Sequence, residues 1–276
     1  WRSVLKEISA IQKRKKETGS QSDQTSVSHR VWYTGEIRNR LIRSYAHRIS
    51  ILQSNKPPKE RIVTMSILNY AEQDSWSNGF GSQQSPIDLR QAEPTSVTNF
   101  VVTDPWIADR EIDDQVTIQL AGHGTTRINE MTWHFVQAHI HVPAEHITTE
   151  ETVAELHFVH QSVIGALCVV AVLVPIGKAN PIIDGILDHF QPHATESIDC
   201  DLTGLLPNRG TVFQYLGSLT TPPLTEGVTW YVIEQTDITI SSEQLKRYKQ
   251  LFGPNNRQVQ AANQRPVLRG SGTFTK

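Results

Sequence analysis

The sequence predicts a mainly β domain with short helices, of the α+β class, preceded by a partly helical extension. After about residue 62 the chain consists of short segments rich in β-branched and aromatic residues, separated by turns, as is typical of strands. Helical patterns interrupt these segments only at residues 180–190 and 242–251. The expected strands cover residues 97–102, 115–120, 132–142, 152–160, 167–174 and 228–234.

The N-terminal part has a different pattern, and we expect an extension over residues 1–62 and one domain over residues 63–276. Apolar residues at helical spacing predict helices over residues 4–11 and 37–52. The polar stretch at residues 18–28 between them has no periodicity and is interpreted as a linker.

Charge separates the same two parts. Residues 1–62 hold 14 Lys and Arg against 5 Asp and Glu, and the remaining residues hold 12 against 23, which together give the net charge of −2. A basic arm of this kind can bind an acidic partner, anionic lipid or nucleic acid, or lie back on its own acidic body. Nucleic acid is not expected, because residues 13–16 form only one small basic cluster and no nucleic-acid-binding motif accompanies it.

Hydropathy argues against an integral membrane protein. The richest apolar stretch, residues 163–176, has about 14 residues, is shorter than a membrane span, and is interpreted as a buried strand. The two cysteines, Cys168 and Cys200, allow at most one disulfide. A first residue of Trp and the basic arm together suggest a processed protein of a mitochondrion or plastid.

Histidines concentrate between residues 139 and 160. In a strand, alternate residues share a face, so Gln137, His139 and His141 lie on one face and Glu155 and His157 on one face of the next strand. A turn over residues 143–151 makes these strands antiparallel and brings the two faces together. Three neutral imidazoles leave the fourth position of a tetrahedral Zn²⁺ open, as in a catalytic site.

The flanking polar residues support this interpretation. Gln137 and Glu155 are placed to accept hydrogen bonds from the ring N–H groups that do not face the metal. The alternative is that these histidines have no metal and simply form hydrogen bonds within polar strands. For a lone His-x-His pair that interpretation would be favoured. The third histidine and the two acceptors favour the metal site instead.

These residues resemble the α-class carbonic anhydrases, over roughly residues 65–270. The resemblance lies in six pieces that occur in the family's order: Gln84-Ser-Pro-Ile-Asp88, Gln137-Ala-His-Ile-His141, Ala144-Glu-His146, Glu155-Leu-His-Phe-Val-His160, Gly217-Ser-Leu-Thr-Thr-Pro-Pro-Leu-Thr-Glu-Gly227 and Asn256-Arg257. It implies a single large domain around a mostly antiparallel, twisted sheet of about ten strands, with zinc at the bottom of a cleft.

The resemblance also implies the roles of individual residues. His139, His141 and His157 would bind zinc; Thr220 would accept a hydrogen bond from zinc hydroxide and pass its own proton to Glu145. Residues matching the family's substrate pocket are Val159, Val169, Leu219, Thr221 and Trp230. Taken alone, Thr220-Thr-Pro-Pro is simply a Pro-rich turn, and the apolar residues could be ordinary core.

Departures from the family pattern concern proton transfer. Fast members carry a shuttle histidine after an Asn-Gly pair, and the best match here, Asp113-Asp114-Gln115, offers Gln115, which cannot relay a proton as imidazole does. His123, in a Gly-His-Gly segment interpreted as a surface turn, is the substitute candidate. We therefore expect an enzyme slower than the fastest members.

Two functions remain open at this stage. The first is a zinc lyase that interconverts carbon dioxide and bicarbonate; the retained ligands His139, His141 and His157, with Thr220 and Glu145, favour it. The second is a weak or inactive interaction subunit on the same fold, docked to a protein partner or a membrane-associated complex through residues 1–62.

Overall fold

The computed structural model describes residues 68–276. The chain divides into two units, Trp1–Thr64 and Met65–Lys276, and the described residues all belong to the second. The helices expected over residues 4–11 and 37–52, the linker, and the docking and compartment predictions for the basic arm lie outside the described residues.

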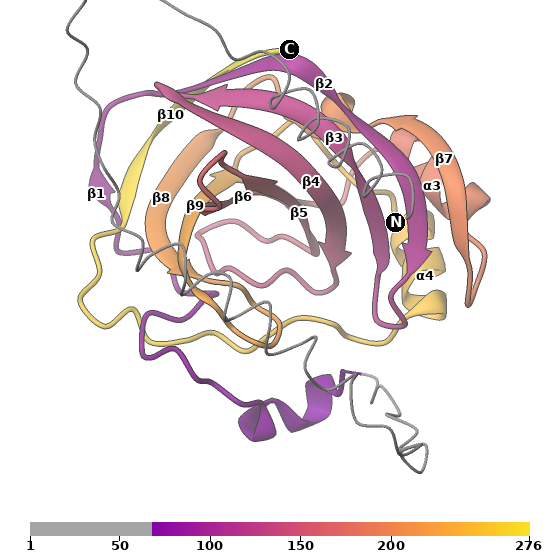
Figure 1. Ribbon diagram of the computed structural model, residues 1–276, viewed down its shortest axis with the longest axis horizontal. Helices are drawn as coiled ribbons and strands as arrows, with labels where there is room; N and C mark the ends of the chain where they lie inside the picture. Colours follow the sequence, from indigo (N-terminus) through magenta and orange to yellow (C-terminus); the bar gives the residue numbers. More distant parts are fainter. Residues whose placement is uncertain (1–67) are drawn as a thin grey trace, which may run out of the picture. The chain divides into compact units, whose positions relative to one another are not determined.

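The domain is built on a ten-stranded, mostly antiparallel sheet (Figure 1), which confirms the predicted fold class. The strand order is β1-β10-β8-β9-β6-β5-β4-β3-β2-β7, and β10 pairs with β2 as well. The strands are β1 (Glu93–Pro94), β2 (Thr98–Asp113), β3 (Ile118–Ile128), β4 (Met131–His141), β5 (Ala154–Gln161), β6 (Leu167–Val174), β7 (Thr195–Asp201), β8 (Thr211–Ser218), β9 (Glu226–Glu234) and β10 (Leu268–Thr275).

The sheet returns on itself through its last strand. Gly272 to Thr275 of β10 pair in parallel with Thr98 to Val101 of β2, while the start of β10 pairs with β8. The strands β10, β8, β9, β6, β5, β4, β3 and β2 therefore form a closed ring, with β1 and β7 as additional strands.

The helices are short. The helices α3 (Pro181–His189) and α4 (Ser242–Leu251) and the 3₁₀ helix η3 (Leu202–Leu205) pack on one face of the sheet, and a second 3₁₀ helix, η2 (Tyr70–Ser75), precedes the first strand. The Asn180 side chain caps α3, and α4 begins with a capping box of Ser241 and Gln244, which satisfies free N–H groups at each helix start. Both α-helices lie where the sequence predicts helices.

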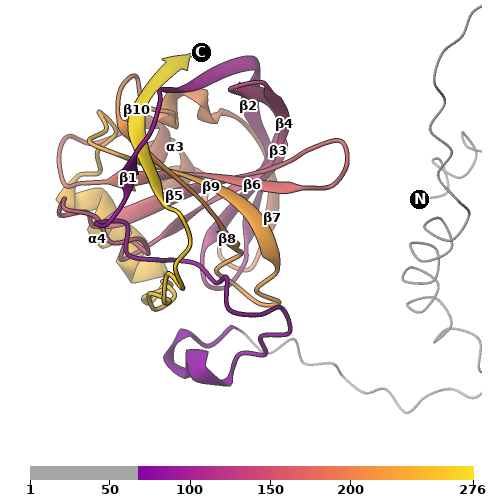
Figure 2. The ribbon, with the colours of Figure 1, turned by 90° about the vertical axis from the view of Figure 1, so that its left-hand side faces the viewer.

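The apolar stretch at residues 163–176, interpreted from sequence as a buried strand, is not a strand at its start, whereas the expected strand over residues 167–174 is confirmed. Val163 and Ile164 are each 86% exposed, at the tip of the β5–β6 hairpin that projects beyond its neighbours in Figure 2. The Ser162 N–H donates to the Ala166 carbonyl at 2.9 Å, and Gly165 has φ +87°, so residues 162–166 form a tight turn. The buried strand begins only at Leu167.

Four strands, β1, β7, β8 and β10, were not predicted. The apolar strand β8 was overlooked, β1 has only two residues, and β7 and β10 have polar or glycine-rich sequences. The side chains of β7 are mostly exposed along its length, and β10 alternates exposed and half-buried residues. Strands with so little buried surface lack the apolar signal on which sequence prediction depends. Pairing with β2 and β8 places them in the sheet.

Apolar side chains form two clusters, one on each face of the sheet. The larger cluster packs the sheet against α3 and α4 and includes Trp106, Phe135 and Phe158. The smaller cluster includes Val159, Val169 and Trp230 and lies on the face that carries the histidine site. Within residues 68–276, no helix combines the length and the apolar character that crossing a membrane requires.

His160 introduces a pH-sensitive group into the larger cluster. It is fully buried, its ring lies 5.1 Å from that of Trp106, and its Nδ1 donates to the Phe158 carbonyl at 2.9 Å. Burial lowers the pKa of His160 to about 4, although that hydrogen bond opposes the shift. The imidazole is therefore neutral in the folded protein near neutral pH.

We expect His160 to make folding less favourable in acid. Its folded pKa lies below the unfolded value of about 6.5, so the stabilisation is complete above pH ~6.5 and is lost as pH falls toward 4. Between pH 7 and 4.5, wild type should lose about 2 kcal/mol more unfolding free energy than His160→Phe, because only the wild-type unfolded chain takes up this proton. Urea unfolding with EDTA present measures the difference; equal losses in the two proteins would contradict it.

Candidate metal centre

The antiparallel pairing of β4 and β5 brings the histidines together. His139 lies opposite His157, and His141 lies opposite Glu155, so the predicted arrangement of the two strands is confirmed. Ring centroids are 4.9 Å apart for His139 and His141, 5.2 Å for His139 and His157, and 4.5 Å for His141 and His157. One ring nitrogen from each lies within 4.8 Å of the other two.

The other ring nitrogen of each histidine has a hydrogen-bond acceptor. His139 Nδ1 lies 2.8 Å from Gln137 Oε1, His141 Nδ1 lies 2.6 Å from the Asn255 carbonyl, and His157 Nε2 lies 2.8 Å from Glu155 Oε1. Because an oxygen of these kinds accepts, each contact fixes the protonated nitrogen and leaves the opposite one with a free lone pair. The tautomers are those that three metal-ligating imidazoles require.

The site fits a metal ion for a second reason. His141 Nε2 is buried and has no hydrogen-bond partner among the described residues, which is unusual for a polar atom without a ligand. Burial lowers the pKa of His139 and His157 and lowers that of His141 to about 4, and repulsion between the rings adds to the shifts of His139 and His157. Neutral imidazoles are the form that binds Zn²⁺.

Glu155 connects this site to a second buried histidine. Its Oε1 also accepts from His146 Nδ1 at 2.6 Å, and its Oε2 accepts from the backbone N–H groups of Glu145 and His146 at 2.8 Å each. Burial opposes ionisation of Glu155, but these donors outweigh it and hold its pKa well below the usual range. Since the contacting atoms of His146, Glu155 and His157 bind one another, this trio supports the site rather than forming another.

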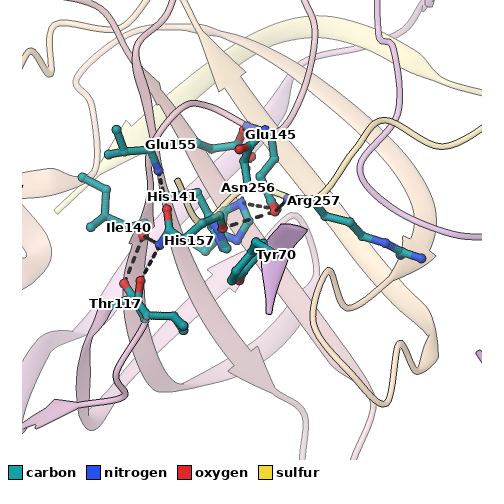
Figure 3. A network of polar contacts seen from close by, with 12 residues as sticks. Tyr70, Thr117, Ile140, His141, Glu145, Glu155, His157, Asn256 and Arg257 are labelled. Atoms are coloured by element: carbon teal, nitrogen blue, oxygen red, sulfur yellow. Dashed lines mark hydrogen bonds and ion pairs between the residues drawn. The ribbon is translucent and has the colours of Figure 1, made fainter. Parts of the chain in front are cut away.

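Glu145 is a second buried carboxylate beside the histidines (Figure 3), with Oε1 3.4 Å from His141 Nδ1 and Oε2 3.9 Å from His157 Nε2. Its Oε1 accepts from the Arg257 N–H at 2.7 Å, whereas Oε2 has no full hydrogen bond within the described chain. Burial raises the pKa of Glu145 to about 7, with His157 and the nearby Thr220 hydroxyl among the groups that oppose the shift. Thr220 is itself buried, and because its side-chain hydrogen bond acts on the pKa of Glu145, the two predicted catalytic side chains lie close together.

Four of the five predicted pocket residues belong to, or pack against, the smaller apolar cluster, and one of them, Trp230, contacts His157. Val159, Val169 and Trp230 are buried in the smaller cluster, and Leu219 packs against it. The Trp230 ring lies 5.0 Å from that of His157, and its Nε1 donates to the Ser218 carbonyl at 2.9 Å. Thr221 is half-buried in the loop that follows Thr220.

Neither proton-relay candidate makes a hydrogen bond to the three histidines, and the turn predicted around His123 is wrong. His123 lies within β3, opposite Ile107 of β2, with its side chain 70% exposed. A Cβ on Gly122 would lie 1.9 Å from the Ile107 carbonyl oxygen, so this glycine permits close approach of two strands rather than a turn. Gln115 occupies the β2–β3 turn with φ +67° and is exposed.

Two residues at the site were missed from sequence. Asn255 is buried; its carbonyl accepts from His141, and its side-chain oxygen accepts from the Val142 N–H at 2.7 Å. Tyr70, in η2, lies beside the histidines in Figure 3, and its pKa is raised by burial and then by Glu145. No sequence pattern connects either residue to the histidines, because each lies on a segment that is distant in the sequence.

Replacing Gln137 with alanine should weaken zinc binding about 10- to 100-fold, the usual effect of removing an outer partner of a ligating histidine. The physical reason is that His139 loses the acceptor that fixes its tautomer. Competition with a chelating dye measures the affinity, and Gln161→Ala, at an exposed glutamine of β5, is the control. Equal affinities in the two variants would contradict the prediction.

Comparison with known proteins identifies the family. The profile of the eukaryotic-type carbonic anhydrase family matches residues 71–271, which include every histidine and acceptor described above. The chain belongs to this family. The activity is accordingly that of a carbonic anhydrase enzyme, which hydrates carbon dioxide.

Individual relatives are similar over most of the domain. A carbonic anhydrase of Neisseria gonorrhoeae is 32% identical over 213 residues, covering 71% of this chain and 83% of its own. Alpha carbonic anhydrase 4 of Arabidopsis thaliana is 32% identical, covering 68% and 74%. The solved carbonic anhydrase of Thermovibrio ammonificans, in complex with sulfanilamide, is 31% identical with a TM-score of 0.64, covering 68% of this chain and 87% of its own.

Proposed function

We propose that this carbonic anhydrase interconverts carbon dioxide and bicarbonate with zinc held by His139, His141 and His157. The observation that carries the proposal is the set of three neutral imidazoles, each with one nitrogen bonded outward and the other free within 4.8 Å of its counterparts. When bound, zinc lowers the pKa of its water to about 7 and so supplies hydroxide at neutral pH, an effect for which carbonic anhydrases are the type example.

Thr220 and Glu145 would orient the reacting groups. With Glu145 ionised, Thr220 donates its hydroxyl proton to the free Oε2, and the threonine oxygen is then an acceptor only. A hydroxyl group next to Thr220 must then point its hydrogen at the threonine oxygen, so Thr220 fixes the orientation of that group for reaction. Arg257 keeps Glu145 in place through the bond to Oε1.

Apolar side chains would hold the substrate. Carbon dioxide has no hydrogen to donate and no charge, so a wall formed by Val159, Val169, Leu219 and Trp230 suits it better than it suits water. Thr221, beside Thr220 in the same loop, completes the pocket. Bicarbonate is charged and interacts less favourably with these apolar side chains, so it would dissociate.

Proton transfer would limit the rate. Gln115 has no titratable group, and His123 is an exposed residue of β3 that lines a surface hollow with Asp104 and His134. The described surface thus offers no histidine at the position predicted for a shuttle. We expect turnover below that of the fastest family members, with a marked dependence on buffer concentration.

Stopped-flow carbon dioxide hydration by the zinc-loaded chain tests the proposal, with His139→Ala as control. A sulfonamide-sensitive rate that is absent from the control and rises with buffer concentration is the expected result. A zinc-loaded chain with no rate above the control would contradict it and would favour an interaction subunit instead.

A further inference from the structure

Gln84 is a buried side chain for which the proposed reaction has no role. It is 4% exposed and directly precedes Ser85 and Pro86, in a segment far in sequence from the histidine strands. Its side chain has hydrogen-bond partners on three other segments of the chain, at both ends of the loop that carries Thr220 and at Arg257.

The first set of contacts reaches both ends of the Thr220 loop. Gln84 Nε2 donates to the Leu224 carbonyl at 3.2 Å, and Gln84 Oε1 lies 3.4 Å from Ser218 Oγ, whose single proton also has the Leu219 carbonyl as an acceptor at 2.7 Å. The neighbouring Ser85 strengthens the Ser218 end, because its N–H donates to Ser218 Oγ at 2.9 Å and its Oγ accepts from the Ser218 N–H at 3.0 Å. Residues 84–85 therefore fix the points where the loop leaves β8 and where it returns.

The second set of contacts reaches Glu145. Arg257 Nη1 donates to Gln84 Oε1 at 2.9 Å and to the Ser85 carbonyl at 2.7 Å, while the Arg257 backbone N–H holds Glu145 Oε1. Figure 3 shows the Arg257 side chain extending away from the histidines, with its backbone beside Glu145. Gln84 and Glu145 thus contact the two ends of one residue, Arg257.

Glutamine suits this position because its side chain both donates and accepts hydrogen bonds. Its oxygen accepts from Arg257 at 2.9 Å, and its nitrogen donates to the Leu224 carbonyl and to Glu226 Oε1, which lies 3.0 Å away. A carboxylate lacks the donors, and an apolar side chain lacks both and leaves a buried guanidinium short of an acceptor. The backbone here has its own anchor, since Arg265 Nη2 donates to the Gln84 carbonyl at 2.7 Å, so a change of side chain leaves the segment attached.

We propose that Gln84 is a positioning residue: it holds the Thr220 loop and the Glu145 carboxylate in fixed positions relative to each other. It contacts no histidine of the metal centre, and its effect passes through Ser218, Leu224 and Arg257. The catalytic consequence rests on the proposed function, whereas the loop-holding role can be measured without metal or substrate.

The test compares Gln84→Met, Gln84→Glu and the matched control Gln83→Met. Gln83 is the exposed neighbour, and its side chain makes no hydrogen bond within the described residues. In the metal-free protein, amide hydrogen exchange is followed at Leu219, whose N–H donates to the Thr225 carbonyl, and at Leu224, whose N–H donates to the Thr221 carbonyl. In the zinc-loaded protein, zinc affinity and carbon dioxide hydration are measured.

Gln84→Met should exchange at least about tenfold faster at both amides, with protection of β5 and β6 unchanged. Its kcat should fall about 10- to 100-fold, a size typical of losing a supporting contact, while zinc affinity stays within about threefold. Gln84→Glu keeps an acceptor for Arg257 but loses the donors to Leu224 and Glu226 and places a second carboxylate against Glu226, so exchange should rise at Leu224 and kcat should fall. This second variant also decides the matter if Gln84→Met does not fold.

Exchange in the Gln84 variants equal to that of Gln83→Met would overturn the proposal, as would a uniform rise over the whole domain with kcat falling only in proportion to unfolded protein. These outcomes differ from failure of the proposed function. If wild type does not hydrate carbon dioxide, the exchange measurement still accepts or rejects the positioning role.

Discussion

Replacing His141 with alanine is expected to abolish zinc binding and to lower carbon dioxide hydration by more than about 10³-fold, beyond the 10- to 100-fold effect of losing an outer partner. His141 is 1% exposed, and its Nε2 is the buried nitrogen without a partner. Its loss leaves two imidazoles, which do not retain the metal at low free zinc. Metal analysis after dialysis and stopped-flow hydration measure the two effects.

His134→Ala is the matched control, because His134 lies on the same strand and is exposed. It should retain wild-type zinc content and rate. A His141→Ala protein that keeps one zinc per chain after dialysis would show that His141 is not a ligand, whatever its rate.

Replacing Thr220 with valine is expected to lower kcat/KM about 10²- to 10³-fold, the usual effect of removing one oriented hydrogen-bonding group from an active site. Valine keeps the shape of threonine and removes only the hydroxyl, so zinc content should not change. Thr225→Val, in the same loop, is the control, since the Thr225 contact described above uses its backbone carbonyl. A loss of rate that follows a loss of zinc would contradict the assigned role.

The pairing of Thr220 with Glu145 predicts strong non-additivity. Glu145→Gln should produce a similar loss, because an amide does not accept the threonine proton in the same way as the carboxylate. The double variant should then lose little more than either single variant, since both changes remove the same interaction. Losses that multiply would show that the two side chains act independently.

The central part of the site could be predicted from sequence because its geometry is local. His139, His141, Glu155 and His157 lie on two successive strands, where a period of two and one turn decide which side chains meet. Nearly all of the fold's apolar strands follow from the same rule. The family resemblance added Thr220 and Glu145, which the spacing of residues alone does not connect.

The rest could not be predicted because it depends on contacts between distant segments. His141 and Asn255 are 114 residues apart, and Gln84 and Arg257 are 173 residues apart. No periodicity links such pairs. The polar strands β7 and β10 were missed for a related reason: partner strands rather than their own apolar pattern decide their conformation.

The closing of the sheet by β10 has a consequence for biosynthesis. The pair of Thr98 and Gly272 joins positions 174 residues apart, and pairings of such long range form late because loop-closure entropy opposes them. Until β10 has been synthesised, the start of β2 and the outer side of β8 remain unpaired sheet edges. A nascent chain lacking its last strand is therefore the form most exposed to edge-to-edge aggregation, and the stage at which a chaperone has most to protect.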